Sequence, residues 1–550
     1  MPHTFELPQS YPDAALAIAM DTIVRDKQAL VFCSTKKGAE SQAEKIAQKV
    51  KIKGASQADA AQVGVAREAV LAEIAQSILD AVNSPTKQCT RLAACVRKGV
   101  AFHHSGLASK QREIVETRFR DGTISVICAT PTLAMGMDLP AFRSVIRDLK
   151  RFNKGTSWGM SEIPVLEYEQ MAGRAGRPGK ETAGEAICIA ETESERDRIV
   201  ERYLLGDPEE IHSKLAVEPV LRTYVLSLIA SGYVHDVEEL YAFFDGTFYA
   251  WQYGDTDRLH EILDRMVRLL SDWGFVEAPA GGYDRGVGGG FVVASDMAAG
   301  VLRSTPVGQR VAQLYIDPYT AHHLIVSLEH ALAAGLQVDG FALLHLLSTT
   351  LEMRPLPSVK QSELDDIDRL VVEREDALIV KSPSIYSHEY EEYLQSIKVA
   401  AFLEGWIEEL GEDVLLESFG VTPGDLQAKR TTADWLLYSL VELSKLEGWH
   451  SLIAGLERMR VRLEYGAKEE LLALLRLKGI GRVRARKLVH NGVRSIEDVR
   501  RIDATHLKML LGEKMAIDLK SQVGQEIAPS KIVVAPNKRK GQVNLGDFGE

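Results

Sequence analysis

The stretch LVFCSTKKGAE, residues 30–40, passes from an apolar run to a polar one within a few residues. Leu30 to Cys33 are typical of a buried strand, since strands covered on both faces are apolar almost throughout. Ser34, Thr35 and Lys36 follow where the strand ends. Hydroxyls and backbone N–H groups at the start of a helix bind phosphates. The stretch therefore predicts a strand-to-helix turn of an α/β sheet with a phosphate contact at Ser34 and Thr35.

Four more apolar runs of this kind lie along the first 208 residues. They are GVAFHHSG (99–106), TISVICAT (123–130), SVIRDL (144–149) and GEAICIA (184–190). Segments compatible with helices separate them, and strands that alternate with helices indicate a mostly parallel sheet covered on both faces. We expect residues 1–208 to form one α/β domain.

Polar motifs close these runs and extend beyond them. FHHSGL contains His104 and Ser105, ICATPTLAMGMDLPA contains Thr130 and Thr132, and QMAGRAGR begins at Gln170. Arg174 and Arg177 of the last motif alternate with glycines that let the backbone approach a ligand closely. A planar guanidinium stabilises charge that spreads over phosphoryl oxygens. Surface ion pairs are the alternative for these arginines, but they leave the glycine spacing unexplained.

The rest of the chain divides into helical units. Residues 209–302 end in FVEAPAGGYDRGVGGGFVVAS, two strand-like runs around a glycine-rich loop, which predicts a winged helix or an ordinary hairpin of another α+β module. Residues 303–465 have helical periodicity and predict a bundle. Residues 466–528 predict a compact helical domain, and 529–550 are rich in Pro, Lys and Gly and predict a disordered tail. The predicted fold class is multidomain, with an α/β domain followed by helical ones.

Length and composition are consistent with several soluble domains. A chain of 550 residues is too long to fold around a single hydrophobic core, and its net charge is −12. From Gly466 onward there are 17 Lys/Arg against 10 Asp/Glu, a net +7, which leaves −19 for the preceding residues. The basic end is therefore a candidate phosphate contact. No apolar run reaches the roughly 18 residues of a membrane span and no signal pattern opens the chain, so we expect a cytoplasmic protein without a membrane contact. The five scattered cysteines predict reduced thiols and no metal site.

The four motifs, in this order and spacing, resemble the second RecA-like domain of superfamily 2 helicases. Their wording is that of the Ski-like branch. The succession of winged helix, helical ratchet bundle and final small helical domain is similar to archaeal DNA-repair helicases of the Hjm type, which are related to the helicase portion of polymerase theta. The resemblance covers nearly the whole chain.

The resemblance implies a role for each motif residue. Gln170, Arg174 and Arg177 match the catalytic motif VI, whose arginines contact the γ-phosphate. Further nucleotide contacts are Gly136, Asp138 and Gly173. The residues implied to bind single-stranded DNA in this domain are Ser34, Thr35, His104, Ser105, Thr130 and Thr132.

Three more DNA contacts follow from the resemblance. The stretch RDLKRFNKGTSWGMSEIPV (147–165), with a turn centred on Asn153 to Gly159, is implied to form a β-hairpin that separates the strands, with Phe152 and Trp158 stacking at its tip; a solvent loop is the alternative. Trp435 matches a base-stacking tryptophan of the bundle, although a core role is equally compatible with the sequence. The family's arginine falls on Ala428 here, with Lys429 and Arg430 as its neighbours, so the details of this grip are open.

Two motifs lie near the end of the chain. LLRLKGIGRVRARKLVHNGV (474–493) fits a helix-hairpin-helix whose turn amides bind a DNA phosphate. Its candidate DNA contacts are Lys478, Gly479, Gly481, Arg482, Arg484 and Arg486, and a basic helix pair without a ligand is the alternative. Gln542, Leu545 and Phe548 have the spacing of a sliding-clamp peptide, which short motifs in tails also match by chance.

The sequence contains neither a GxxxxGK[ST] phosphate cradle nor a DExH carboxylate pair. ATP and Mg²⁺ would thus be shared with a first RecA-like domain, from another subunit or from a longer gene product. We expect the C-terminal part of an ATP-dependent 3′–5′ DNA helicase that unwinds forked or branched DNA in repair and replication restart. The alternatives are a catalytically silent protein that binds branched DNA and tethers a clamp, and an RNA helicase of the same branch.

Overall fold

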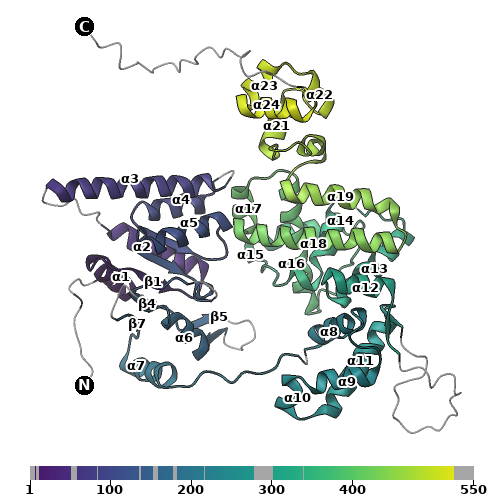
Figure 1. Cartoon of the computed structure of the whole chain (residues 1–550), viewed down its shortest axis with the longest axis horizontal. Coiled ribbons are helices and arrows are strands. Elements are labelled where there is room, and N and C mark those ends of the chain that lie inside the picture. Colours follow the sequence, from purple (N-terminus) through teal and green to yellow (C-terminus); the bar gives the residue numbers. More distant parts are fainter. Residues whose placement is uncertain are drawn as a thin grey trace.

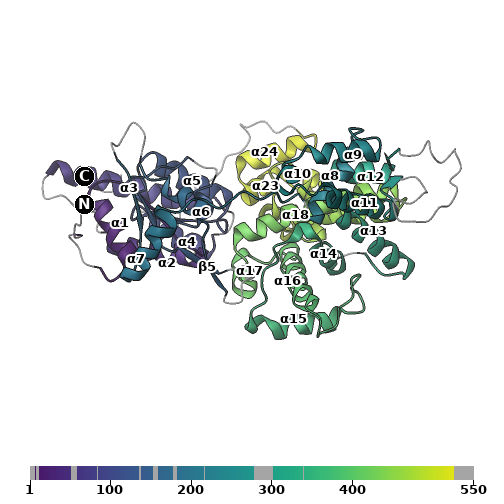
Figure 2. The same cartoon turned by 90° about the horizontal axis from the view of Figure 1, so that it is seen from below.

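The computed structural model shows an α/β unit beside a group of helical units, with a small helical unit at the C-terminal end (Figure 1). Figure 2, turned by 90°, shows the same separation into two parts. The structure describes Leu7 and residues 11–50, 58–82, 85–135, 138–152, 159–176, 183–215, 217–277, 301–338 and 340–525.

A five-stranded parallel sheet forms the centre of the α/β unit. Its strands are β1 (Ala29–Phe32), β2 (Val100–His103), β3 (Val126–Ala129), β4 (Arg143–Ile146) and β7 (Glu185–Cys188). They lie in the order β2-β3-β1-β4-β7, and Leu30 of β1 pairs with Ile127 and Ser144 on its two sides. Every residue of β1 to β4 is buried, as expected for a sheet covered on both faces. The predicted α/β fold and its five strand runs are confirmed.

Helices connect these strands and cover the sheet. They are α1 (Ala14–Val24), α2 (Lys36–Lys49), α3 (Ala58–Asp80), α4 (Lys87–Val96), α5 (Ser109–Arg120), α6 (Val165–Ala172) and α7 (Glu193–Ile199). The short η1 (Pro131–Leu133) follows β3, η2 (Val200–Leu204) continues α7, and β5 (Lys150–Phe152) pairs with β6 (Met160–Glu162) outside the main sheet. The Thr35 hydroxyl accepts a 3.0 Å bond from the Gly38 N–H and so caps α2.

All five cysteines lie in this unit as free thiols. Cys33, Cys89, Cys95 and Cys128 are buried, whereas Cys188 is partly exposed. Burial raises the pKa of Cys33 and of Cys95 to about 12. These thiols therefore stay protonated at neutral pH.

An extended segment leads from the α/β unit to α8 (Glu218–Ala230), α9 (Val237–Asp245), α10 (Phe248–Tyr253) and α11 (Thr256–Asp272). Two short antiparallel strands follow, β8 (Val276–Glu277) and β9 (Arg303–Ser304). The second strand run predicted for the wing, 291–295, lies outside the described residues. Since β9 begins at Arg303, the paired strands extend just past the boundary expected at residue 302.

The bundle comprises α12 (Pro306–Leu314), α13 (Pro318–Ala333), α14 (Gly340–Ser348), η3 (Leu351–Met353), α15 (Gln361–Arg374), α16 (Glu389–Ile407), α17 (Glu412–Phe419), α18 (Pro423–Leu446) and α19 (His450–Tyr465). One hydrophobic core runs from Leu221 of α8 to Leu463 of α19. The units predicted as winged helix and bundle therefore pack as one body.

The C-terminal unit has a core of its own, from Ala467 to Val523. It consists of η4 (Glu469–Leu471), α20 (Leu472–Leu475), α21 (Arg482–His490), α22 (Ile496–Arg501), α23 (Ala504–Leu511) and α24 (Glu513–Gln522). Residues 526–550, which include the predicted clamp peptide, lie outside the described part of the chain. Within the described ranges, no helix has the length and apolar character needed to cross a membrane.

Candidate nucleic-acid and nucleotide interface

The predicted phosphate contacts of the α/β unit gather at one edge of the sheet. Ser34 follows β1, and Thr130 and Thr132 follow β3; all three line a pocket of about 230 Å³. The carboxyl ends of parallel strands share an edge, which explains why residues about 100 positions apart meet here. The two threonine hydroxyls lie 2.9 Å from each other. The structure thus places three of the predicted residues in a single concave surface.

Sequence reasoning missed three charged residues of this pocket, Asp148, Arg151 and Glu167. Asp148 accepts bonds from the backbone N–H and the hydroxyl of Ser34, at 2.9 and 3.2 Å. Arg151 donates to Glu167 at 2.7 Å. One threonine hydroxyl donates to the other, so one hydroxyl proton of this pair remains for a phosphate. Asp148 could have been expected here, because it ends the strand run SVIRDL at the same edge.

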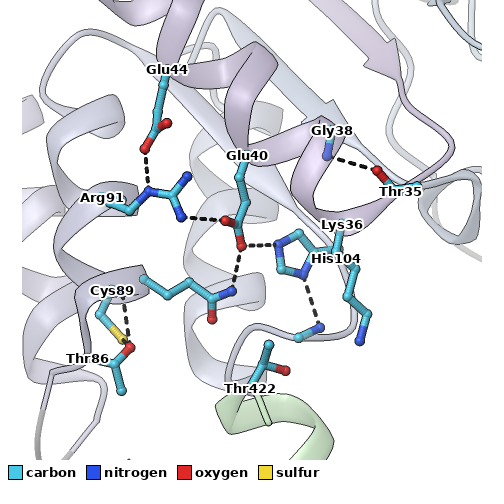
Figure 3. A network of polar contacts seen from close by, with 12 residues as sticks. Thr35, Lys36, Gly38, Glu40, Glu44, Thr86, Cys89, Arg91, His104 and Thr422 are labelled. Atoms are coloured by element: carbon cyan, nitrogen blue, oxygen red, sulfur yellow. Dashed lines mark hydrogen bonds and ion pairs between the residues drawn. The ribbon is translucent and has the colours of Figure 1, made fainter. Parts of the chain in front are cut away.

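The FHHSGL loop is held from inside by His104 (Figure 3). The ring is fully buried, its Nδ1 accepts a 3.1 Å bond from the Gly106 N–H, and its Nε2 lies 3.1 Å from Glu40. Because Nδ1 accepts, the ring proton lies on Nε2 and is donated to Glu40. His104, predicted as a DNA contact, therefore supports the loop from within the domain. Ser105 is exposed at the loop's surface.

Glu40 is the centre of the polar network shown in Figure 3. It accepts bonds from Gln88 and from Arg91, both at 2.6 Å. Burial alone would raise the pKa of Glu40, but the bonds from His104 and Gln88 and the charge of Arg91 outweigh it and lower the pKa. Glu40 is thus held as a carboxylate beneath the loop.

The same loop contacts the first turn of α18. The Gly424 N–H donates to the Gly106 carbonyl at 3.0 Å, and Lys36 forms a 2.7 Å ion pair with Asp425. A Cβ atom at Gly424 would lie 2.0 Å from the Ser105 carbonyl oxygen, so only glycine permits this approach. The sheet edge and α18 therefore meet directly, and Figure 3 shows Thr422 beside the loop.

The predicted DNA residues of α18 differ in how open they are. Trp435 is half-buried, and its indole N–H donates to the Leu314 carbonyl at 3.0 Å. Lys429 donates to backbone carbonyls of Met353 and Pro355. Arg430 lies over the Trp406 ring at 4.2 Å and donates to the Leu463 carbonyl at 3.0 Å, and burial lowers its pKa to about 10. Both basic residues thus bind the protein's own interior, and Trp435 is partly exposed at the edge of the core.

The nucleotide motifs form one edge through backbone pairing. The Ala141 N–H donates to the Arg174 carbonyl at 2.9 Å, and the Gly176 N–H donates to the Ala141 carbonyl at 2.7 Å. The Arg174 guanidinium donates to the Ala134 carbonyl from Nε, at 3.1 Å, and from Nη2. Gly176 has a φ of +95°, which explains one glycine of the motif.

Three of the four predicted nucleotide contacts within the described residues are open at this edge. Asp138, Gln170 and Gly173 are exposed, and Arg174 is half-buried. The edge can therefore offer a carboxylate, an amide and a guanidinium to a ligand. Gly136 and Arg177 lie outside the described residues.

The base of the predicted strand-separating hairpin is present. β5 and β6 pair antiparallel, with Lys150 opposite Glu162 and Phe152 opposite Met160. The side chain of Phe152 and residues 153–158, which include Trp158, lie outside the described part of the structure.

Basic residues of the C-terminal unit divide into two groups. Lys478 and Arg484 are exposed beside the turn, where Gly479 has a φ of +83° and Gly481 precedes α21. Arg482 instead lies over the Trp406 ring at 4.6 Å and donates to the Gly466 carbonyl at 3.2 Å.

Arg486 also turns toward the bundle. It forms ion pairs with Glu409 and with Glu470, both at 2.5 Å. Two of the three arginines predicted to bind DNA therefore attach this unit to the rest of the protein. Lys478 and Arg484 are exposed, and Arg484 donates to the Gly479 carbonyl of the turn at 2.6 Å.

Three parts of the chain match known protein families. The family described as archaeal helicase, domain 4, matches residues 341–466. The helicase conserved C-terminal domain matches 81–179, and the SAM-like helix-hairpin-helix tandem matches 471–524. These matches cover β2 to β4 with the motifs from FHHSGL onward, the bundle from α14 to α19, and most of the C-terminal unit.

Full-length relatives decide the family. The ATP-dependent DNA helicase Hel308 of Methanocella arvoryzae is 36% identical over 94% of this chain and 65% of its own length. The helicase of the same name from Pyrococcus horikoshii is 34% identical over 95% of this chain and 67% of its own length. The one from Caldivirga maquilingensis is 31% identical over 98% of this chain and 69% of its own length. The chain belongs to the Hel308 family. It spans about two thirds of the length of these Hel308 relatives, and the resemblance to archaeal Ski-like helicases is confirmed.

Proposed function

We propose that this chain provides the C-terminal part of an ATP-dependent 3′–5′ DNA helicase that unwinds forked or branched DNA in repair and replication restart. The observation that carries the proposal is a pair of backbone contacts that bring motif regions distant in the sequence together. Backbone pairing between Ala141 and Ala175 joins the nucleotide motifs, and the contact between Gly106 and Gly424 joins the sheet edge to α18. The Hel308 relatives named as ATP-dependent DNA helicases support it.

The nucleotide edge fits half of an ATP site. Asp138, Gln170 and Gly173 are open to a ligand, and Arg174 and Arg177 would place guanidiniums on its phosphates. ATP supplies the driving free energy when its terminal phosphoryl group is transferred to water. The phosphate cradle and the carboxylates for Mg²⁺ would come from a first RecA-like domain, on a separate subunit or in a longer chain.

The DNA path would run across the sheet edge and along α18. Thr130 and Thr132 would hold phosphates, the hairpin based on β5 and β6 would separate the strands, and Trp435 would stack on a base. Backbone amides of the turn at Gly479 and Gly481, with Lys478 and Arg484, would hold a further phosphate. The chain would act in the cytoplasm, and Gln542, Leu545 and Phe548 would tether it to a sliding clamp.

ATP hydrolysis measured with the purified chain and a separately expressed first RecA-like domain tests the proposal. The chain alone is expected to hydrolyse no ATP, and the added domain to restore DNA-stimulated turnover. Arg177→Ala is expected to abolish that turnover and to leave DNA binding intact. Hydrolysis by the chain alone that survives Arg174→Ala and Arg177→Ala would overturn the assignment. DNA binding without turnover in any combination would favour the silent DNA-binding alternative.

A further inference from the structure

Tyr315 ends α12 in a backbone conformation that normally requires glycine. Its φ is +58°, in the left-handed region, where the Cβ of other residues crowds the backbone. Within the described ranges, only Asp26 and Glu409 are other non-glycine residues with positive φ. Aspartate tolerates this region, and Glu409 is held by two bonds to Arg486. Tyr315 has neither reason.

The Tyr315 side chain does not serve the core. It is 81% exposed, whereas its neighbours Leu314 and Ile316 are buried. No hydrogen bond, ion pair or ring contact of this side chain occurs with the part of the protein that the structure describes. A left-handed backbone thus presents a flat, open aromatic face to solvent, and such a costly arrangement points to a role outside the fold.

Tyr315 directly follows the residue that binds the half-buried tryptophan of α18. The carbonyl of the preceding residue, Leu314, accepts the Trp435 indole N–H at 3.0 Å. One turn earlier in α12, Arg310 donates to the Tyr438 hydroxyl at 3.3 Å and to Glu442 at 2.5 Å. The C-terminal end of α12 is therefore pinned to the face of α18 that carries Trp435, and Figure 1 shows the two helices together.

The surroundings favour stacking over phosphate binding. Arg310 is paired with Glu442, and Arg460 is paired with Asp434 at 2.9 Å, so the nearby guanidiniums are neutralised. A nucleobase offers a planar face to an exposed aromatic ring whatever its sequence, and its attraction depends little on salt. The occupant that fits an open ring among paired charges is a base of single-stranded DNA.

We propose that Tyr315 is a base-stacking residue, which with Trp435 forms an aromatic site for single-stranded DNA where α12 meets α18. The proposal rests on the proposed function, because it takes the DNA path along α18 from there. It adds a contact from α12, an element to which the sequence motifs assign no DNA contact.

Binding of a fluorescently labelled oligothymidine at several salt concentrations tests the site. Tyr315→Ala is expected to weaken binding about tenfold, in keeping with one lost stacking contact, with an unchanged log–log salt slope. Tyr315→Phe keeps the ring and is expected to bind like the unchanged chain. Tyr386, which is 93% exposed between α15 and α16, supplies the matched control, and Tyr386→Ala is expected to have no effect.

Tyr315→Gly separates a binding role from a structural one. Glycine relieves the left-handed conformation, so the melting temperature is expected to rise by about 2 °C while DNA affinity falls as it does for Tyr315→Ala. A lower melting temperature with unchanged affinity would overturn the proposal. If Trp435→Ala weakens binding and Tyr315→Ala does not, this inference alone fails. If neither change weakens binding, the DNA path along α18 fails with it.

Discussion

The sheet edge and the C-terminal unit position their candidate ligand groups by different means. At the sheet edge, the backbone of β3 and η1 places Thr130 and Thr132, whose short side chains reach only the pocket they line. In the C-terminal unit, some long arginine side chains extend into solvent and others contact the rest of the protein. Arg482 and Arg486 reach back to the bundle, where Trp406 and Glu409 receive them.

This difference shows when a charged or polar residue can be counted as a ligand contact. A short side chain at the end of a strand is positioned by the topology, which the order of strands determines. A long basic side chain on a surface helix is positioned by whatever anions, carbonyls and rings lie within its reach. Positive charge near the end of the chain therefore predicts an interface. It does not distinguish an interface with DNA from one with the protein's own bundle.

The largest expected effect is at Arg174, in the part of the molecule whose candidate ligand groups are positioned by the backbone. Arg174→Ala should lower DNA-stimulated ATP turnover, with the first RecA-like domain added, by at least about 10³-fold, since it removes the proposed phosphate contact. It also removes the tie to the Ala134 carbonyl. Arg196→Ala, a change of an exposed arginine on α7, is the control and should leave the rate of phosphate release unchanged. Turnover within tenfold of the unchanged chain would remove Arg174 from the site.

A smaller effect is expected where the sheet edge meets α18. Gly424→Ala should destabilise this contact by about 1–3 kcal/mol, because its Cβ would lie 2.0 Å from the Ser105 carbonyl oxygen. Faster hydrogen exchange at the Leu107 amide, measured by mass spectrometry, would report the loosened loop. Gly411→Ala, at the start of α17, meets nothing within 4 Å and should exchange like the unchanged chain. Equal exchange in both variants would mean that the loop and α18 do not depend on each other.

The two groups of basic residues in the C-terminal unit should differ in how their removal changes the salt dependence of DNA binding. Lys478→Ala with Arg484→Ala should flatten the log–log slope of single-strand binding by about 1.4, from two lost phosphate contacts. Arg482→Ala with Arg486→Ala should leave this slope nearly unchanged and lower the melting temperature of the unit. Fluorescence anisotropy over a salt series measures the first effect and calorimetry the second. The reverse assignment of slopes would restore the interface expected from the sequence alone.

The smallest expected effect is the pH dependence of the bond between Glu409 and Arg486. Burial would raise the pKa of Glu409, but the bonds from Arg486 outweigh it and hold the pKa below its ordinary value of 4.5. The stabilisation is therefore present above pH 4.5 and lost as the pH falls through the lowered pKa. The melting temperature of the unchanged chain should exceed that of Glu409→Gln at pH 7, and the gap should close below pH 4.5. A constant gap would show that this carboxylate does not contribute through its charge.

The sheet could be predicted from sequence because a buried strand is a run of apolar residues, which can be recognised without its partners. Each of the first four strands is apolar enough to be found alone, and parallel topology then places Ser34 and Thr130 at one edge. The same reasoning could not find which donors are already used. Asp148, which binds Ser34, lies 114 positions away, and Glu409, which binds Arg486, lies 77 positions away.

His104 shows this limit most clearly. Its motif ends a strand at the sheet edge, as Thr130 does, and the local sequence of both fits a ligand contact. Only the packing of α2 against β2 brings Glu40 beneath the ring and buries it. Whether such a side chain supports the fold or contacts a ligand depends on which distant segments pack together. A local sequence pattern does not contain this information.

The distribution of thiols gives experimental access to the helical half of the protein. Native cysteines occur only among residues 33–188, and at Cys33 and Cys95 the raised pKa of about 12 suppresses the thiolate that alkylating dyes require. The partly exposed Cys188 also has its pKa raised by burial, to about 11. A cysteine introduced at the exposed Gln313 of α12 would thus react far faster than the native ones. A single maleimide fluorophore could follow this helix when DNA is added, without removal of any native thiol.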